Sequence, residues 1–165
     1  LVEYGRTGKK IVRLKSGDSS IFSRLEEEIT ALNENGLEFE IIPGVSSAMA
    51  AAAAAKIPLT RRVMSRRVQF ITGHDFNGVL PDDLNIASLI DPNCTTVIFM
   101  GKKTFPNLAR ILLENGLDIK TKVLIAEDIS RKEENITKGT IEEILIYLKD
   151  IQSNHPAVII FGPLL

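Results

Sequence analysis

The apolar positions of this 165-residue chain follow two patterns, one typical of strands and one typical of helices, which alternate along the chain. Short runs rich in β-branched and aromatic residues predict strands, and longer stretches with apolar positions three or four residues apart predict helices. A strand run, a polar turn and a helical stretch follow one another several times. This succession predicts an α/β protein with an open, largely parallel sheet.

The first third of the chain contains two predicted strands, at 10–14 and 37–42, and two predicted helices, at 21–35 and from Ser46 or Ser47 through Ala55. The opening residues resemble the last turns of a helix that stops at Gly8, where glycine suits the position after a helix. Because no helix start precedes them, we expect the first domain to be truncated.

The remainder carries four predicted strands and three predicted helices. The strands are expected at 67–72, 95–99, 122–126 and 156–161, and the helices at 84–89, 105–115 and 140–149. No strand is predicted between 128 and 140. A break with a proline and a basic pair separates two α/β regions. We therefore predict domains at 1–57 and 66–165, with a hinge at 58–65.

Composition narrows the functional classes. A net charge of −1 lacks the basic excess of proteins that follow a nucleic-acid backbone. A single cysteine, Cys94, excludes an internal disulfide framework, and with two separated histidines it predicts no metal site. The apolar run 48–55 is too short to cross a bilayer. We expect a cytoplasmic protein without a nucleic-acid or membrane partner.

The stretch IVRLKSGDSSIF, residues 11–22, is the best candidate for a ligand-binding turn. A predicted strand leads through a tight polar turn towards a helix. Ligands of open α/β sheets bind at the carboxyl ends of strands, where such turns expose backbone N–H and C=O groups. Asp18 is the strongest candidate, because a carboxylate in a turn accepts charge-assisted hydrogen bonds.

The motifs together resemble one family. The segments IVRLKSGDSSIFSR, FEIIPGVSSAMAAAAAAKIPLTRR, VQFITGH, TTVIFMGKK, KGTIEEI and PAVIIFG are similar, in order and spacing, to those of the tetrapyrrole methylases. Within that family the likeness is greatest to the uroporphyrinogen-III C-methyltransferases, alone or as a module of sirohaem synthase. It covers the whole chain.

The resemblance implies two α/β domains with S-adenosylmethionine in the cleft between them, usually in a homodimer. It implies methylation of uroporphyrinogen III to precorrin-2, with S-adenosylhomocysteine as the second product. The catalytic residues are expected upstream of Leu1, so we expect this chain to be an incomplete portion that is inactive by itself. The cofactor-binding residues implied are Ser16, Gly17, Asp18, Ile21, Ser46, Ser47, Met100, Ile129 and Ala157. Arg61 and Arg62 are candidates for binding the substrate carboxylates, since arginine pairs with them bidentately.

Each candidate also has a plain structural interpretation. Asp18 suits a helix cap, Met100 suits core packing, and the basic pair suits a solvated surface. Lys102 is expected at the surface, and His155 is expected to have no special role.

Two alternatives to the methylase function stay open. Where the family has glycine and Pro-Phe, the loop carries Ser16, Ser19 and Ser20, which favours a non-catalytic remnant or binding module on the same fold. The other alternative is a methylase of a later corrinoid intermediate or of ribosomal RNA ribose, the latter disfavoured by the charge.

Overall fold

A computed structural model describes residues 1–150 and 155–164. Its chain divides into two compact units, Leu1–Ser47 and Ala48–Leu165, which are described separately. The division lies within the helix α3, Ser47–Ala55, ahead of the predicted hinge at 58–65. These units are defined by where contacts between residues are dense, which does not locate a hinge. The predicted domain boundaries therefore stay predictions.

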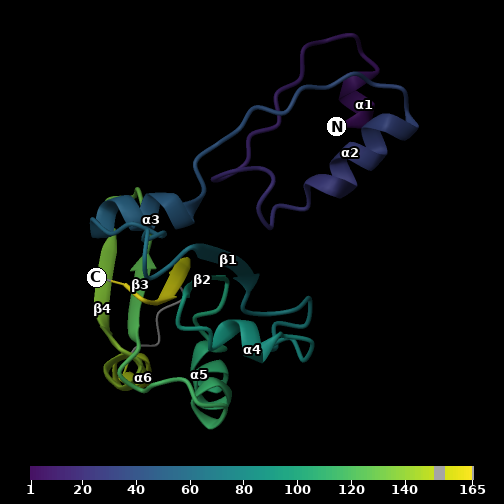
Figure 1. Ribbon diagram of the computed structural model, residues 1–165. Helices are drawn as coiled ribbons and strands as arrows, with labels where there is room; N and C mark the ends of the chain where they lie inside the picture. Colours follow the sequence, from purple (N-terminus) through teal and green to yellow (C-terminus); the bar gives the residue numbers. More distant parts are fainter. Residues whose placement is uncertain (151–154, 165) are drawn as a thin grey trace. The chain divides into compact units, whose positions relative to one another are not determined.

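The first unit contains two helices, α1 at Val2–Gly5 and α2 at Leu25–Glu34, with long connecting segments (Figure 1). All of its residues are described, and none forms a strand. The predicted strands at 10–14 and 37–42 are therefore wrong. Their apolar side chains are exposed, as Leu14 and Ile42 show, and no hydrogen-bonded ladder holds either segment extended.

The second unit is a sheet of five strands in the order β1-β2-β5-β3-β4. The strands are β1 at Arg67–Thr72, β2 at Cys94–Phe99, β3 at Lys122–Glu127, β4 at Asn135–Thr140 and β5 at Ala157–Gly162. The mixed α/β architecture confirms the predicted fold class. The predicted strands of this unit form within a residue or two. β2, β3 and β5 each have a buried apolar run, whereas β1 is only half-buried.

The sheet is mixed, so the expectation of a largely parallel sheet is wrong. Only β1 and β2 pair in parallel, and the pairs β2–β5, β5–β3 and β3–β4 are antiparallel. The missed strand β4 causes part of this difference, since the hairpin from β3 into β4 reverses the chain. Its burial pattern is mostly intermediate, as expected of an edge strand.

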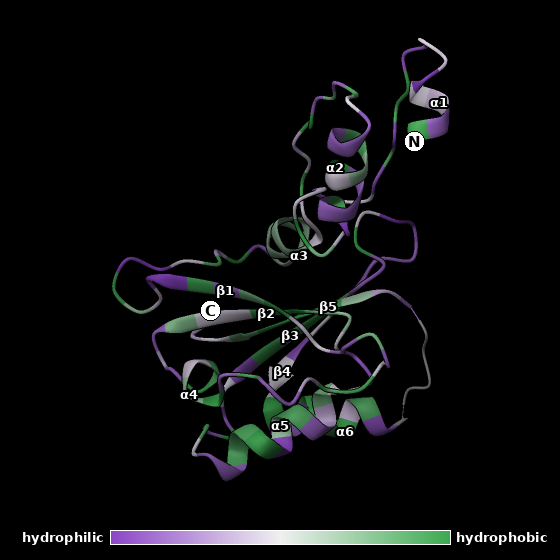
Figure 2. Ribbon diagram, turned by 90° about the vertical axis from the view of Figure 1, so that its right-hand side faces the viewer, coloured by the Kyte–Doolittle hydropathy of each residue, from purple (hydrophilic) through white to green (hydrophobic). Residues whose placement is uncertain are grey.

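Helices cover both faces of the sheet (Figure 1). The helix α3 lies on one face, and α4 at Ile86–Leu89, α5 at Phe105–Glu114 and α6 at Ile141–Asp150 lie on the other. Apolar residues run along the central strands between these layers (Figure 2). Successive strand residues point to opposite faces: Ile159 joins the core under α5 and α6, whereas Ile160 joins the core under α3.

The alanine run of α3 packs closely against its face of the sheet. Ala48 and Ala51 are fully buried, and Ala52 and Ala55 nearly so. They pack in one cluster with Val97, Leu124 and Ile160. Small side chains let the helix backbone approach the strands, so close helix–sheet packing explains this run.

Candidate functional site

The first unit brings together four of the residues expected to bind a cofactor. An ideal Cβ on Gly17 would lie 3.6 Å from Ser46 Cα and 3.7 Å from the Ser47 nitrogen. The Gly44 N–H donates to Asp18 Oδ2 at 2.9 Å. Gly17 and Asp18 thus lie against the segment 44–47, although 26 residues or more separate them in the chain.

Asp18 fastens this loop. Its Oδ1 accepts from the Ser20 N–H at 2.8 Å and from the Ser20 hydroxyl, while Oδ2 holds Gly44. The Ser20 hydroxyl, the Ser20 N–H and the Gly44 N–H together lower the pKa of Asp18. The helix-cap interpretation is wrong, since α2 begins only at Leu25 with Arg24 as its N-cap. Asp18 instead accepts hydrogen bonds from Ser20 in its own turn and from Gly44 in the segment 44–47.

Two glycines make the close approach possible. Gly17 has φ +69°, a left-handed conformation that glycine adopts without strain. A Cβ on Gly44 would lie 2.1 Å from the Gly17 carbonyl oxygen. Ser16 does not occupy a left-handed position. The serine that replaces the family's glycine at 16 is therefore free of backbone strain.

Ile21 and the helix α2 frame the same loop. The half-buried Ile21 donates its N–H to the Asp18 carbonyl at 3.3 Å. Lys15 donates to the Ser23 carbonyl at 2.6 Å and pairs with Glu28 of α2 at 2.6 Å. The Lys15 hydrogen bond is the main cause that lowers the pKa of Glu28, against a smaller opposing effect of burial. The loop is thus anchored at both ends.

The other expected cofactor residues lie in the second unit, at one end of its sheet. We call this end the rim: Gly73, residues 100–102, residues 127–130 and residues 156–157. β1, β2 and β3 end at the rim and β5 begins there. Met100, Ile129 and Ala157 are all rim residues.

The rim backbone is closely packed and conformationally strained. A Cβ on Gly73 would lie 2.1 Å from Gly101 Cα. Three non-glycine rim residues adopt the left-handed region: Met100 at φ +55°, Asp128 at +47° and Ser130 at +67°. Strain of this kind concentrates at functional sites. Met100 is 45% exposed, so core packing does not account for it.

Ile129 and Ala157 present their backbones at the rim. Ile129 is partly buried against the core under α3, between Asp128 and Ser130. Ala157 is the first residue of β5 and lies opposite Glu127. The Asp128 N–H donates to the Pro156 carbonyl at 3.0 Å, which joins the two segments.

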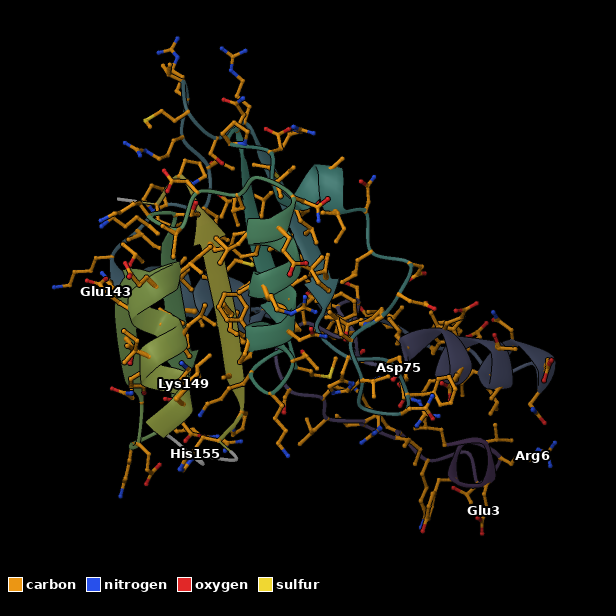
Figure 3. All side chains as sticks on the ribbon, turned by 90° about the horizontal axis from the view of Figure 1, so that it is seen from below. Glu3, Arg6, Asp75, Glu143, Lys149 and His155 are labelled. Carbon is orange, nitrogen blue, oxygen red and sulfur yellow. The ribbon has the colours of Figure 1, made fainter. Side chains whose placement is uncertain are left out.

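The rim also contains charged residues that the sequence analysis missed. Lys102 forms an ion pair with Glu127, and their side chains are only 11% and 7% exposed. The expectation of a surface Lys102 is therefore wrong. His155, labelled in Figure 3, pairs its Nδ1 with Asp128 at 2.5 Å, so it has a structural role after all. The sequence did contain a signal for these contacts: Lys102 closely follows one predicted strand, and Glu127 and Asp128 directly follow another.

The two candidate substrate residues differ in their surroundings. The Arg61 Nη1 donates to the Pro163 carbonyl at 3.3 Å, and the Arg61 backbone pairs with Ser65. Arg62 is exposed, and its carbonyl accepts from Arg66 Nε at 3.3 Å. Arg62 thus has the more accessible side chain of the pair.

Comparison with known proteins identifies the family. The family model for tetrapyrrole (corrin/porphyrin) methylases matches residues 1–145. This chain belongs to the tetrapyrrole methylase family. It is 38% identical over 166 residues to the siroheme synthase of Chromobacterium violaceum and 39% identical over 163 residues to that of Gluconobacter oxydans. The matches cover 98% of this chain and 34% of each relative, so the chain spans about a third of their length.

Solved methylase structures share the fold. The uroporphyrin-III C-methyltransferase of Thermus thermophilus, complexed with S-adenosylhomocysteine, superposes with a TM-score of 0.81 at 29% identity. That match covers 98% of this chain and 69% of the other. A cobalt precorrin-4 methyltransferase superposes with a TM-score of 0.84 at 25% identity, covering 95% of this chain and 65% of the other.

No helix within the described residues is long and apolar enough to cross a membrane. Over the same residues, no three His, Cys, Asp or Glu side chains gather as metal ligands would.

Proposed function

We propose that this chain forms part of an S-adenosylmethionine-dependent methyltransferase that converts uroporphyrinogen III to precorrin-2, on the route to sirohaem or cobalamin. The observation that carries the proposal is its similarity, over 98% of its length, to a uroporphyrin-III C-methyltransferase solved with S-adenosylhomocysteine. The siroheme synthase relatives support the same substrate.

The first-unit loop fits a polar ligand of this kind. Ser19 Oγ is the buried side-chain oxygen that has no hydrogen-bond partner among the described residues. Buried polar atoms without a partner are rare, and one beside a left-handed glycine suits a ligand contact. Ser16, Gly17, Asp18, Ile21, Ser46 and Ser47 would contribute to holding the cofactor. Asp18 retains acceptor capacity, since two carboxylate oxygens offer about four lone-pair sites.

At the rim, Met100, Ile129 and Ala157 would contribute the remaining contacts. Met100 offers a soft, half-exposed side chain, and Ile129 and Ala157 offer backbone groups. The left-handed turns on either side of Ile129 fix the direction of its peptide groups. This arrangement supports binding through the backbone, for which the identity of the side chain matters little.

The bound cofactor supplies an activated methyl group on a sulfonium. The residues of this chain have the task of orientation, because alignment of donor and acceptor contributes most of the rate when the donor is already reactive. Asp18 holds the first-unit loop in place, and the glycines allow its close packing. Arg62, with Arg61 beside it, would pair with carboxylates of the tetrapyrrole.

Calorimetry and a methyl-transfer assay test the proposal. We expect the chain to bind S-adenosylhomocysteine, and Asp18→Ala to weaken binding about tenfold or more, the usual cost of a hydrogen bond to a charged group. In the full-length enzyme, Arg62→Ala should raise the KM for uroporphyrinogen III without changing cofactor affinity. Val12→Ala, an exposed change, is the matched control. A full-length protein that neither binds S-adenosylhomocysteine nor transfers methyl to uroporphyrinogen III contradicts the proposal.

A second candidate substrate is a corrinoid intermediate. The TM-score of 0.84 to a cobalt precorrin-4 methyltransferase favours it. A competition assay with uroporphyrinogen III and a corrinoid precursor separates the two by the product formed. Binding of S-adenosylhomocysteine without transfer to either would support the binding-module alternative.

We also propose that the protein is a homodimer. Light scattering after size-exclusion chromatography measures its oligomeric state.

A further inference from the structure

The buried ion pair between Lys102 and Glu127 links two strands that do not pair with each other. Lys102 lies three residues past the end of β2, and Glu127 is the last residue of β3. β5 lies between these strands in the sheet. The ion pair therefore bridges the rim at the point where β5 begins with Ala157.

Two further elements hold the carboxylate. The Tyr147 hydroxyl of α6 donates to Glu127 Oε2 at 3.1 Å, and the Asn135 amide of β4 donates to the same oxygen at 3.3 Å. Lys102 occupies Oε1. Burial raises the pKa of Glu127, but the hydrogen bonds from Lys102, Asn135 and Tyr147 outweigh it and lower the pKa overall. Glu127 is thus an ionised acceptor for several neighbouring elements.

Global stability is a weak explanation for this arrangement. Two charges with side chains only 11% and 7% exposed lose much of their hydration, and a well-packed apolar pair often serves stability as well or better. What an ion pair adds is a defined geometry between the two side chains. The question is which part of the molecule needs that geometry.

The strained rim residues are the neighbours of the pair. Met100 lies two residues before Lys102, Asp128 follows Glu127 directly, and Ser130 lies three residues after Glu127. A left-handed conformation is strained for a non-glycine residue and persists only where the surrounding structure holds it. The ion pair is attached to the chain at both strained segments, so it is placed to hold them.

We propose that the Lys102–Glu127 ion pair is a positioning device, which holds Met100 and Ile129 in the arrangement that binds S-adenosylmethionine. This inference rests on the proposed function. The pair acts through the rim backbone, so neither residue needs to contact the cofactor or the tetrapyrrole. Loss of either charge should release the strained segments and weaken cofactor binding.

Calorimetric titration of S-adenosylhomocysteine into the chain and its variants tests the inference. Lys102→Met removes the charge and keeps the length of the side chain, and we expect the Kd to rise about tenfold, as small misplacements in a binding site cause. Glu127→Gln should raise it similarly. Lys102→Arg keeps the charge and should restore affinity. Arg110→Met breaks the exposed pair with Glu114 and should leave the Kd unchanged.

A second control separates positioning from stability. Ile141→Val should lower the melting temperature without changing the Kd, because it removes a buried methyl group at the end of the sheet opposite the rim, where β4 ends and β3 begins. Lys102→Met leaves the buried Glu127 without its cation, so it should also lower the melting temperature. Unlike Ile141→Val, it should in addition raise the Kd about tenfold. If Lys102→Met fails to fold, Glu127→Gln takes its place.

The outcomes are distinct. If both charge variants bind like the unmodified chain, the positioning role is overturned while the proposed function stands. If Ile141→Val weakens binding as much as the charge variants do, loss of stability explains the effect and the positioning role is also overturned. If the unmodified chain does not bind S-adenosylhomocysteine, the proposed function fails first.

Discussion

The two units of the chain use similar apolar patterns with different results. In the second unit, the runs at 67–72 and 95–99 become paired strands with helices on both faces. In the first unit, the equally β-rich runs at 10–14 and 37–42 stay outside any ladder, with Val12 71% and Leu14 81% exposed. The difference teaches that β propensity describes fitness for a half-buried surface, and that neighbouring strands and a covering layer decide whether a strand forms.

The sharpest way to break this comparison is to shorten one apolar side chain in each unit. Ile159→Ala should lower the free energy of unfolding by about 2–5 kcal/mol, because it leaves a cavity in a fully buried core. Val12→Ala should change it by less than about 0.5 kcal/mol, as exposed substitutions do. Denaturant unfolding of the two variants measures both values. Equal losses would show that residues 10–14 are packed as tightly as the sheet.

The close approach of Gly17 and Gly44 gives the first unit an ordered feature of its own. Gly44→Ala should cost about 1–3 kcal/mol of local stability, since its Cβ would lie 2.1 Å from a backbone oxygen that cannot rotate away. Amide exchange at residues 16–20 measures the loosening of the loop. Val45→Ala, at an exposed neighbouring position, is the control. Unchanged exchange in Gly44→Ala would mean that the two loops do not approach as described.

Much of the second unit was predictable from the sequence because its signals are local. Buried apolar runs predict β2, β3 and β5, and the β-rich, half-buried run RVQFIT predicts β1. The glycine after α5, Gly116 at φ +98°, marks a helix end. Strand pairing is not local, so the mixed sheet escaped prediction. The edge strand β4 escaped as well, because its alternation is short and includes Lys138 and Gly139.

The candidate site shows the same contrast between features with a local sequence signal and features that depend on non-local contacts. The resemblance to a family predicted the residues that the fold gathers around Gly17 and Asp18. The Lys102–Glu127 ion pair escaped, because residues 25 apart reveal their contact only when the strands that carry them are placed. The left-handed conformations of Met100 and Asp128 were not predicted either, since only a few per cent of non-glycine residues adopt them and no local sequence signal marks which ones do.

Acid pH should change the stability contribution of an ion pair in the second unit more than that of an ion pair in the first. The pKa of Glu127 is lowered in the folded state, so its contribution to stability is present above its ordinary value, about pH 4.3, and is lost as the pH falls through the folded value. Glu127→Gln should therefore flatten the acid limb of the stability curve below about pH 4.5.

The matched control for this pH effect is Glu27→Gln in the first unit. The Arg24 hydrogen bond also lowers the pKa of Glu27, but the Glu27 side chain is 61% exposed and solvent screens the interaction. Unfolding at a series of pH values should show little change in this variant. An equal flattening in both variants would contradict the contrast between a buried and an exposed ion pair.

Amide hydrogen exchange with and without S-adenosylhomocysteine tests the central claim most directly, because it reads both groups of candidate residues at once. The account predicts that the ligand slows exchange in the loops at 16–21 and 44–47 and at the rim residues 100–102 and 127–130. The exposed segment 37–42 should exchange at the same rate in both states. Protection in neither group, under conditions where the ligand is in excess, would contradict the proposed cofactor site.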